Sequence, residues 1–207
     1  MTKRFFAVFL ASVLLASLLS GCFGATDKDN CASDGTDSSR AAANEIAVGI
    51  AQDLDNSLDP YQMTAAGTRE VMFNVFEGLV KPDSDGNYVC AVASDYKVSE
   101  DGLTYTFTLR DNVVFHNGEE CTADDVIYSF ETCAETSITS SVVSALSAIE
   151  DISADGNTIT IVLNAPNPDF ISYVSSVYIV PADYTEQETK PVGTGPFKFD
   201  SYQSGVA

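Results

Sequence analysis

The sequence predicts a mixed α/β domain built from two β-hairpins and a capped helix, and three patterns indicate it. Residues 104–110 alternate threonines with large apolar side chains, which is the period of a half-buried strand. Residues 158–163 repeat that alternation with isoleucine and leucine. Between these two segments, Thr122 begins a stretch whose apolar residues recur at helical spacing. Strands and a helix in this order are expected to share one core.

The first hairpin is predicted over residues 96–110. Its second strand places Tyr105, Phe107 and Leu109 on one face, so these three side chains form the expected core side. Residues 100–102 read Glu-Asp-Gly and supply small polar residues and a glycine, which a reversal with positive φ requires. The two strands are therefore expected to pair in antiparallel fashion.

The capped helix follows an apolar run at residues 113–115 and a His-Asn-Gly turn signal at 116–118. Thr122 and Asp125 have the spacing of a capping box, in which a hydroxyl and a carboxylate bind otherwise unpaired backbone N–H groups. The helix is expected to pack through one stripe, formed by Val126, Ile127 and Phe130.

Three segments before the first hairpin also carry patterns. Residues 46–50 are apolar without polar alternation and are predicted to form the first core strand, buried on both faces. Residues 71–79 are predicted to be helical, with Gly78 as the cap. Residues 81–87 hold a proline and an Asp-Gly pair, which predicts a surface turn. The apolar positions of the expected helix are Val71, Val75, Phe76 and Leu79.

Four segments follow the capped helix. Residues 137–149 are predicted to form a second, weakly amphipathic helix. Residues 151–163 read as the second hairpin, with an Asp-Gly-Asn reversal. Residues 170–180 fit a short helix followed by a strand, and residues 191–199 hold glycines and prolines before another strand signal. The core side of the second hairpin is expected to be Ile159, Ile161 and Leu163.

The N-terminus carries an export signal. Two basic residues precede an apolar run at 5–19 that is short for a membrane span, so residues 1–21 are predicted to be a removed signal peptide. The sequence Leu-Ser-Gly-Cys at 19–22 looks like a lipobox and predicts a diacylglycerol on Cys22; an ordinary signal peptide with a chance cysteine is the alternative. Residues 22–45 are rich in Asp, Ser, Ala and Gly and are predicted to be a flexible tether.

Charge and composition argue against several function classes. The formal net charge is −20, from 10 basic and 30 acidic residues, so phosphate backbones would repel the chain and no nucleic-acid partner is expected. His116 is the single histidine, lies in a predicted turn and has no partner motif for catalysis. Residues 193–195 read Gly-Thr-Gly but lack the rest of a phosphate-binding loop. We therefore expect no enzyme activity, no cofactor and no metal site.

The five cysteines fit no metal-binding spacing. Cys22 is assigned to the lipid, which leaves Cys31, Cys90, Cys121 and Cys133. Cys121 and Cys133 flank one predicted helix and would lie about 18 Å apart at its usual rise, too far for a disulfide. Pairing of Cys90 with either of them stays open.

Four sequence blocks, in order, resemble one family. Residues 93–126 contain an alanine, a run ending in Asp-Gly, a strand ending in Leu-Arg, then Phe-His-x-Gly and Thr-Ala-x-Asp-Val. Residues 58–60 read Leu-Asp-Pro, residues 74–80 Asn-Val-Phe-Glu-Gly-Leu-Val, and residues 193–198 Gly-Thr-Gly-Pro-Phe-Lys. The chain is therefore similar to extracellular solute-binding proteins of the peptide/nickel class, family 5, which serve ABC importers.

The resemblance implies a periplasmic-binding-protein-like (class II) two-lobed α/β fold. Only part of the first lobe and the small mixed α+β domain would be present. Residues 46–63 would be a first-lobe segment, residues 64–183 the small α+β domain, and residues 184–207 the return to the first lobe. Family members are much longer, so the sequence is expected to be an N-terminal fragment or a truncated gene product.

The resemblance also implies a role in solute binding. The loop after Leu-Asp-Pro would contact the ligand, which here points to Thr64, Ala65 and Ala66; ordinary helix-capping residues are the alternative. The expected partners are an oligopeptide, dipeptide or other small solute, an ABC permease, and a bilayer through the anchor, with nickel and haem less favoured. A monomer held on the outer face of the plasma membrane or in the periplasm is expected. A surface lipoprotein acting as an adhesin or sensory co-receptor is the alternative.

Overall fold

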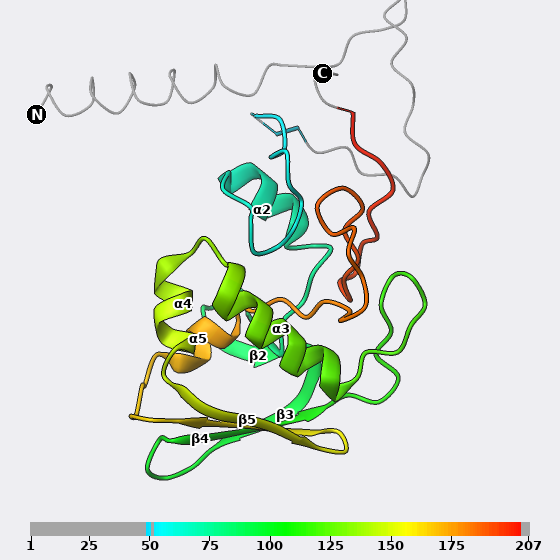
Figure 1. The fold of residues 1–207 in the computed structure, drawn as a ribbon. Helices are drawn as coiled ribbons and strands as arrows, with labels where there is room; N and C mark the ends of the chain where they lie inside the picture. Colours follow the sequence, from blue (N-terminus) through cyan, green and yellow to red (C-terminus); the bar gives the residue numbers. More distant parts are fainter. Residues whose placement is uncertain (1–48, 51, 204–207) are drawn as a thin grey trace, which may run out of the picture. The chain divides into compact units, whose positions relative to one another are not determined.

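The computed structural model describes residues 49–50 and 52–203 (Figure 1). The predicted signal peptide, Cys22, Cys31 and the tether lie outside the described residues, as do residues 46–48 of the predicted first strand. The described residues belong to one compact unit.

A four-stranded antiparallel sheet contains both predicted hairpins. The spatial order is β3-β4-β6-β5, so the second strand of each hairpin lies at the centre. Gly102 and Gly156 make the two reversals with φ of 70° and 55°, which explains the Asp-Gly signals. The strands are β3 (Ala93–Val98), β4 (Thr104–Leu109), β5 (Ile149–Asp155) and β6 (Thr158–Leu163).

One face of this sheet is the predicted core face. Phe107 pairs with Ile159, and Tyr105 pairs with Ile161, across the two central strands. Threonines occupy the other face, where Thr106 lies opposite Thr160. The period of two therefore predicted correctly which side chains are buried. The buried set is Tyr105, Phe107, Leu109, Ile159, Ile161 and Leu163.

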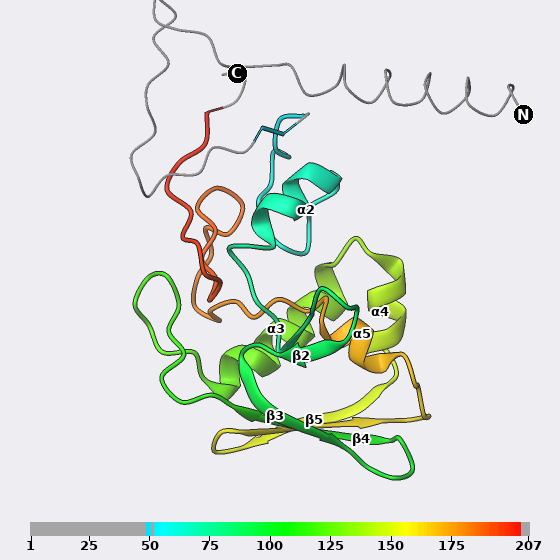
Figure 2. The ribbon, with the colours of Figure 1, turned by 180° about the vertical axis from the view of Figure 1, so that it is seen from behind.

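Three helices lie on one side of the sheet in both views (Figures 1 and 2). The longest is α3 (Ala123–Thr136), and its predicted capping box is present: Asp125 N donates to Thr122 Oγ1, and Thr122 N donates to Asp125 Oδ2. Val126 and Phe130 are buried as predicted, whereas Ile127 is half-buried. The other two helices are α4 (Ser140–Leu146) and α5 (Phe170–Val174).

The predicted surface turn at residues 81–87 joins two short strands. These are β1 (Val80–Pro82) and β2 (Tyr88–Cys90), which pair in a separate two-stranded sheet. Gly86 has φ of 83° at the reversal. The strands were not predicted because three residues are too few to establish an alternation.

The helix predicted at 71–79 is wrong in its position. The observed helix, α2 (Ala66–Met72), ends where the Asn74 amide binds the carbonyls of Glu70 and Val71. Val75, Phe76 and Leu79 are buried, but in extended or turn backbone. Gly78 caps no helix; it pairs with Tyr178, and a Cβ there would lie 2.8 Å from the Val177 carbonyl oxygen. The periodicity identified burial correctly and the secondary structure incorrectly.

Three strand predictions also fail within the described residues. Gly49 and Ile50 are exposed and form no strand, because no described segment offers them a partner strand. Residues 191–199 form no strand, since their backbone groups bind the turns at residues 74–75 and 116. After α5, the bridge at Tyr178 replaces the predicted strand. Isolated apolar runs do not reveal whether a pairing partner exists.

The hydrophobic core extends past the predicted domain boundaries. Leu58, Tyr61 and Met63, which precede position 64, belong to the same buried cluster as the sheet and helices. Val192, which follows position 183, belongs to it as well. The division at residues 64 and 183 stays a prediction.

Candidate functional site

Of the three predicted ligand residues, Thr64 and Ala65 lie immediately before α2, and Ala66 is the first residue of that helix. Thr64 and Ala66 are exposed and Ala65 is half-buried. All three side chains are small, so the loop presents backbone and a hydroxyl at the surface. The structure thus places the three predicted residues together, and their contact with a ligand stays a prediction.

The carboxylate of Asp55 binds this loop. Oδ2 accepts hydrogen bonds from Thr64 N at 2.7 Å and Ala65 N at 2.8 Å, and Oδ1 accepts one from Thr64 Oγ1 at 2.9 Å. The hydrogen bond from Ala65 is the main cause that lowers the pKa of Asp55 below its ordinary value, aided by the bonds from Thr64 and Thr68. Asp55 is therefore ionised at neutral pH, and two of the loop's N–H donors are occupied.

Arg69 holds the other end of the loop from within α2. Its guanidinium donates two hydrogen bonds to the Met63 carbonyl, from Nη2 at 2.9 Å and from Nε at 3.2 Å. The backbone of Arg69 also donates to the Ala65 carbonyl at 3.2 Å. Residues 63–65 are thus held by the Asp55 carboxylate and by the guanidinium and backbone N–H of Arg69.

Tyr61 anchors the segment before the loop. Its hydroxyl donates its one proton to the Tyr178 carbonyl at 2.5 Å, with the Ser129 carbonyl oxygen as a second, longer partner at 3.2 Å, and the side chain is buried. Burial raises the pKa of Tyr61 well above its ordinary value. In return, Ile138 N donates to the Tyr61 carbonyl at 3.1 Å. The loop therefore begins from a rigid attachment to the helical layer.

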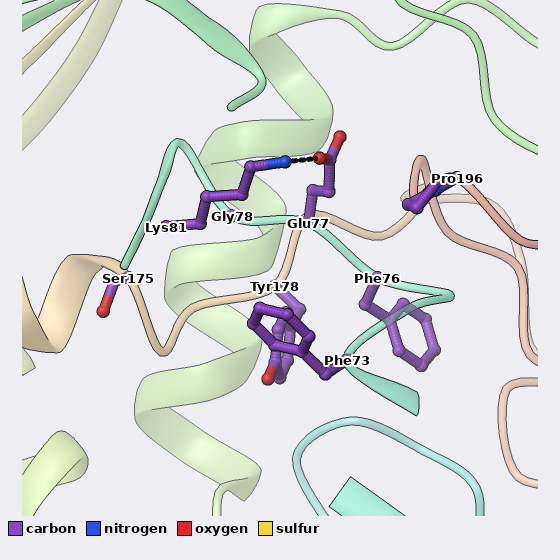
Figure 3. Close-up of a pocket in the computed structure, with 8 residues that line it drawn as sticks. All are labelled: Phe73, Phe76, Glu77, Gly78, Lys81, Ser175, Tyr178 and Pro196. Atoms are coloured by element: carbon purple, nitrogen blue, oxygen red, sulfur yellow. Dashed lines mark hydrogen bonds and ion pairs between the residues drawn. The ribbon is translucent and has the colours of Figure 1, made fainter. Parts of the chain in front are cut away.

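A small hollow lies beyond the C-terminal end of α2 (Figure 3). Phe73 and Tyr178 form one wall, and Figure 3 shows the Glu77–Lys81 ion pair on the other side. The pair is 2.6 Å long, and Arg110 lies 3.7 Å from the same carboxylate. The hollow measures about 50 Å³, far below the several hundred Å³ of ligand pockets. We therefore interpret the hollow as a packing gap and not as a ligand site.

His116 joins its turn to the segment at residues 193–198. Nε2 lies 2.8 Å from the Gly195 carbonyl oxygen and Nδ1 lies 3.4 Å from Gly193 N. Because a carbonyl accepts and an N–H donates, the proton belongs on Nε2. Lys198 Nζ donates to the His116 carbonyl at 2.9 Å. Both ring nitrogens bind backbone, in agreement with the prediction of a turn histidine.

Three cysteines fall in the described part of the chain, and all three are free thiols. The pairing of Cys90 with Cys121 or Cys133, left open by the sequence, is not formed there. Burial, the largest cause, raises the pKa of Cys121 and of Cys133 to about 12. Cys90 is half-buried.

Alkylation with iodoacetamide at pH 8 is expected to modify Cys90 well before Cys121 and Cys133. At that pH a thiol with a pKa of about 12 is ionised in only about one molecule in ten thousand, and the thiolate is the nucleophile. Mass spectrometry of proteolytic fragments over time measures the three rates. Denaturant should equalise them, and equal rates in the native protein would contradict the buried placement.

The described residues give two further findings. None of their helices is long and apolar enough to cross a bilayer. Among residues 49–50 and 52–203, no three His, Cys, Asp or Glu side chains gather as a metal site would require.

Solved structures of periplasmic binding proteins share this fold. The PBP AgaA from A. tumefaciens R10, in complex with agropinic acid, matches 74% of this chain and 33% of its own, with a TM-score of 0.67 and 30% identity. DppA from Helicobacter pylori, in complex with the peptide STSA, matches 73% of this chain and 36% of its own, with a TM-score of 0.64 and 29% identity. The fold class is therefore the α/β fold of periplasmic binding proteins, represented here in part.

The family model described as bacterial extracellular solute-binding proteins, family 5 Middle, matches residues 87–207. The chain belongs to this family of solute-binding transport proteins. The dipeptide-binding protein of Lactococcus lactis is 33% identical over 70% of this chain and 31% of its own length. The oligopeptide-binding protein AppA of Bacillus subtilis is 27% identical over 99% of this chain and 40% of its own. The chain thus spans about a third of the relatives it matches.

Proposed function

We propose that this chain is part of a lipid-anchored solute-binding component of an ABC importer that captures oligopeptides or dipeptides outside the cytoplasm. The observation that carries the proposal is the similarity to relatives named for dipeptide and oligopeptide binding, which reaches 70% and 99% of this chain. The loop of Thr64, Ala65 and Ala66 is the proposed first-lobe contact. A monomer that docks on a membrane permease completes the proposal.

Nickel is another ligand named among similar proteins; a nickel ABC transporter from Bacillus halodurans matches 74% of this chain and 32% of its own, with a TM-score of 0.64 and 31% identity. Imidazole nitrogen is a common ligand for nickel. In this chain both ring nitrogens of His116 already bind the backbone of Gly193 and Gly195. His116 is therefore not proposed as a nickel ligand, and the peptide proposal depends on the relatives named for peptide binding.

Isothermal titration of the longest form that the gene encodes tests the proposal. The probes are separate pools of synthetic dipeptides, tripeptides and tetrapeptides, with nickel–histidine as the competing ligand. At least one peptide pool should release heat and raise the melting temperature, because a ligand that binds only the folded state stabilises it. No heat and no shift with any peptide pool would overturn the proposal. A response to nickel–histidine alone would mean that the solute is nickel and not a peptide.

The lipid anchor is tested separately by Cys22→Ser. Without the thiol no diacylglycerol can be attached, so the variant should leave the membrane fraction and appear in the medium or periplasm. Cys90→Ser, which leaves the lipobox intact, is the control and should stay in the membrane fraction. Retention of Cys22→Ser in that fraction would contradict the anchor.

A further inference from the structure

We propose that Asp55 and Arg69 are positioning residues that hold residues 63–66 in the conformation that receives the peptide. This inference rests on the proposed function, since it concerns the affinity of the same loop. Neither side chain lies in a sequence block that pointed to the family or to the loop. Their role follows from the contacts that they make with the loop backbone.

Asp55 binds the loop through both carboxylate oxygens. Three donors converge on it within 2.9 Å: the N–H groups of Thr64 and Ala65 and the hydroxyl of Thr64. Asp55 is itself fixed, because its N–H donates to Thr68 Oγ1 at 2.8 Å and Thr68 is fully buried in α2. The carboxylate, the loop and the first turn of the helix therefore form one closed set of hydrogen bonds.

Arg69 adds hydrogen bonds to the residue before Thr64 and to Ala65. Its two hydrogen bonds to the Met63 carbonyl fix the residue that enters the loop. Met63 itself is buried, so this carbonyl sits at a fixed point of the core. The backbone from Met63 to Ala65 thus has little freedom left before any solute arrives.

A loop that is held in its binding conformation before the solute arrives raises the fraction of molecules that can bind, and this fraction affects the measured affinity. A loop that adopts the binding conformation only part of the time lowers the apparent affinity by that fraction. The association rate falls by the same factor, whereas the dissociation rate is unchanged once the solute is bound. A side chain that merely stabilises the fold would change neither rate at temperatures where the protein is folded.

The occupied donors also restrict how a peptide can meet the loop. The N–H groups of Thr64 and Ala65 already donate to Asp55, so a peptide cannot pair with them as a β-strand would without breaking those two hydrogen bonds. Contact is left to Ala66 and to the remaining lone pairs of the carbonyl groups, since the Thr64 hydroxyl already donates to Asp55 and the Met63 and Ala65 carbonyls already accept from Arg69. The small exposed side chain of Ala66 is thus the natural point of approach.

The test compares Asp55→Asn and Arg69→Gln with Asp83→Asn. Asp83 makes a matching set of hydrogen bonds in the turn between β1 and β2, accepting from Asp85 N at 2.9 Å and Asn87 N at 2.8 Å, away from the loop. Association and dissociation rates are measured with the peptide pool that binds the unaltered protein, together with the melting temperature and the hydrogen exchange of the Thr64 and Ala65 amides.

Asp55→Asn and Arg69→Gln are expected to slow association about tenfold with unchanged dissociation, and Asp55→Asn to speed exchange at both amides. Asp83→Asn should change neither rate. Unaltered association in both loop variants would overturn the inference, even if exchange rises. Should Asp55→Asn fail to fold, Arg69→Gln decides alone. If the unaltered protein binds no peptide pool, the proposed function is refuted. If, in addition, the Thr64 and Ala65 amides still exchange slowly in Asp55→Asn, the inference is refuted as well.

Discussion

Replacing Phe107 with alanine is expected to lower the free energy of unfolding by about 3–5 kcal/mol. The side chain is fully buried at the centre of the four-stranded sheet, where it pairs with Ile159 and stacks on Tyr96 with ring centroids 5.7 Å apart. Its removal loses apolar burial and leaves a cavity that the paired strands prevent from collapsing. Urea unfolding followed by circular dichroism measures the loss.

Thr108→Ala is the matched control, since Thr108 lies next to Phe107 on β4 and is exposed on the other face. It should change the free energy of unfolding by no more than about 0.5 kcal/mol. Equal unfolding midpoints for the two variants would contradict the burial of the aromatic face.

Gly193→Ala is expected to destabilise the protein by about 3 kcal/mol, at the upper end of the usual cost of overpacking. A Cβ at this position would lie 2.3 Å from the Val75 carbonyl oxygen and 3.1 Å from the Phe76 Cα. Both are backbone atoms in a buried turn, so neither can move aside cheaply. The segment at 193–198 would separate from that turn and from His116.

Gly67→Ala serves as the control for this substitution. Its Cβ would meet nothing within 4 Å, and Gly67 lies inside α2, where alanine is the better helix former. Thermal unfolding should therefore show Gly67→Ala at or above the unaltered melting temperature and Gly193→Ala far below it. A small shift for Gly193→Ala would mean that the close packing of residues 74–76 against 193–195 is wrong.

Local patterns predicted the parts of the fold that local chemistry determines. The alternation around Phe107 and Ile159 identified the core face, because a pleated strand sends neighbouring side chains to opposite sides. The Thr122–Asp125 spacing identified the start of α3, because both partners of a capping box lie within one turn. Gly102 and Gly156 were predicted as reversals since an Asp-Gly pair tolerates positive φ.

Features that depend on distant partners were missed. Phe76 and Leu79 have helical spacing, but the turn at residues 74–75 gives its carbonyls to Gly195 and Phe197, more than a hundred residues along the chain. Residues 191–199 were expected to lead into a strand, but their backbone groups bind turns instead of a neighbouring strand. Periodicity reports which side chains are buried and carries no information on which backbone groups are already paired.

The candidate site shows the same division. The family resemblance pointed to Thr64, Ala65 and Ala66, and the structure places them in succession where the chain enters α2, with Thr64 and Ala66 exposed and Ala65 half-buried. Asp55 and Arg69 had no signal, because a carboxylate nine residues before a loop matches no capping or turn pattern. The one sequence feature between Asp55 and the loop is the Leu-Asp-Pro turn. A turn there predicts that the chain reverses, but not that Asp55 binds the loop.

The affinity of Ala66→Trp for the peptide pool that binds the unaltered protein tests the central claim most directly. Ala66 is exposed and makes no packing contact in the core, so the variant should keep its melting temperature. If the solute rests on this loop, an indole there should weaken binding by about tenfold or more, equivalent to about 1.4 kcal/mol. Unaltered affinity with an unaltered melting temperature would place the solute elsewhere.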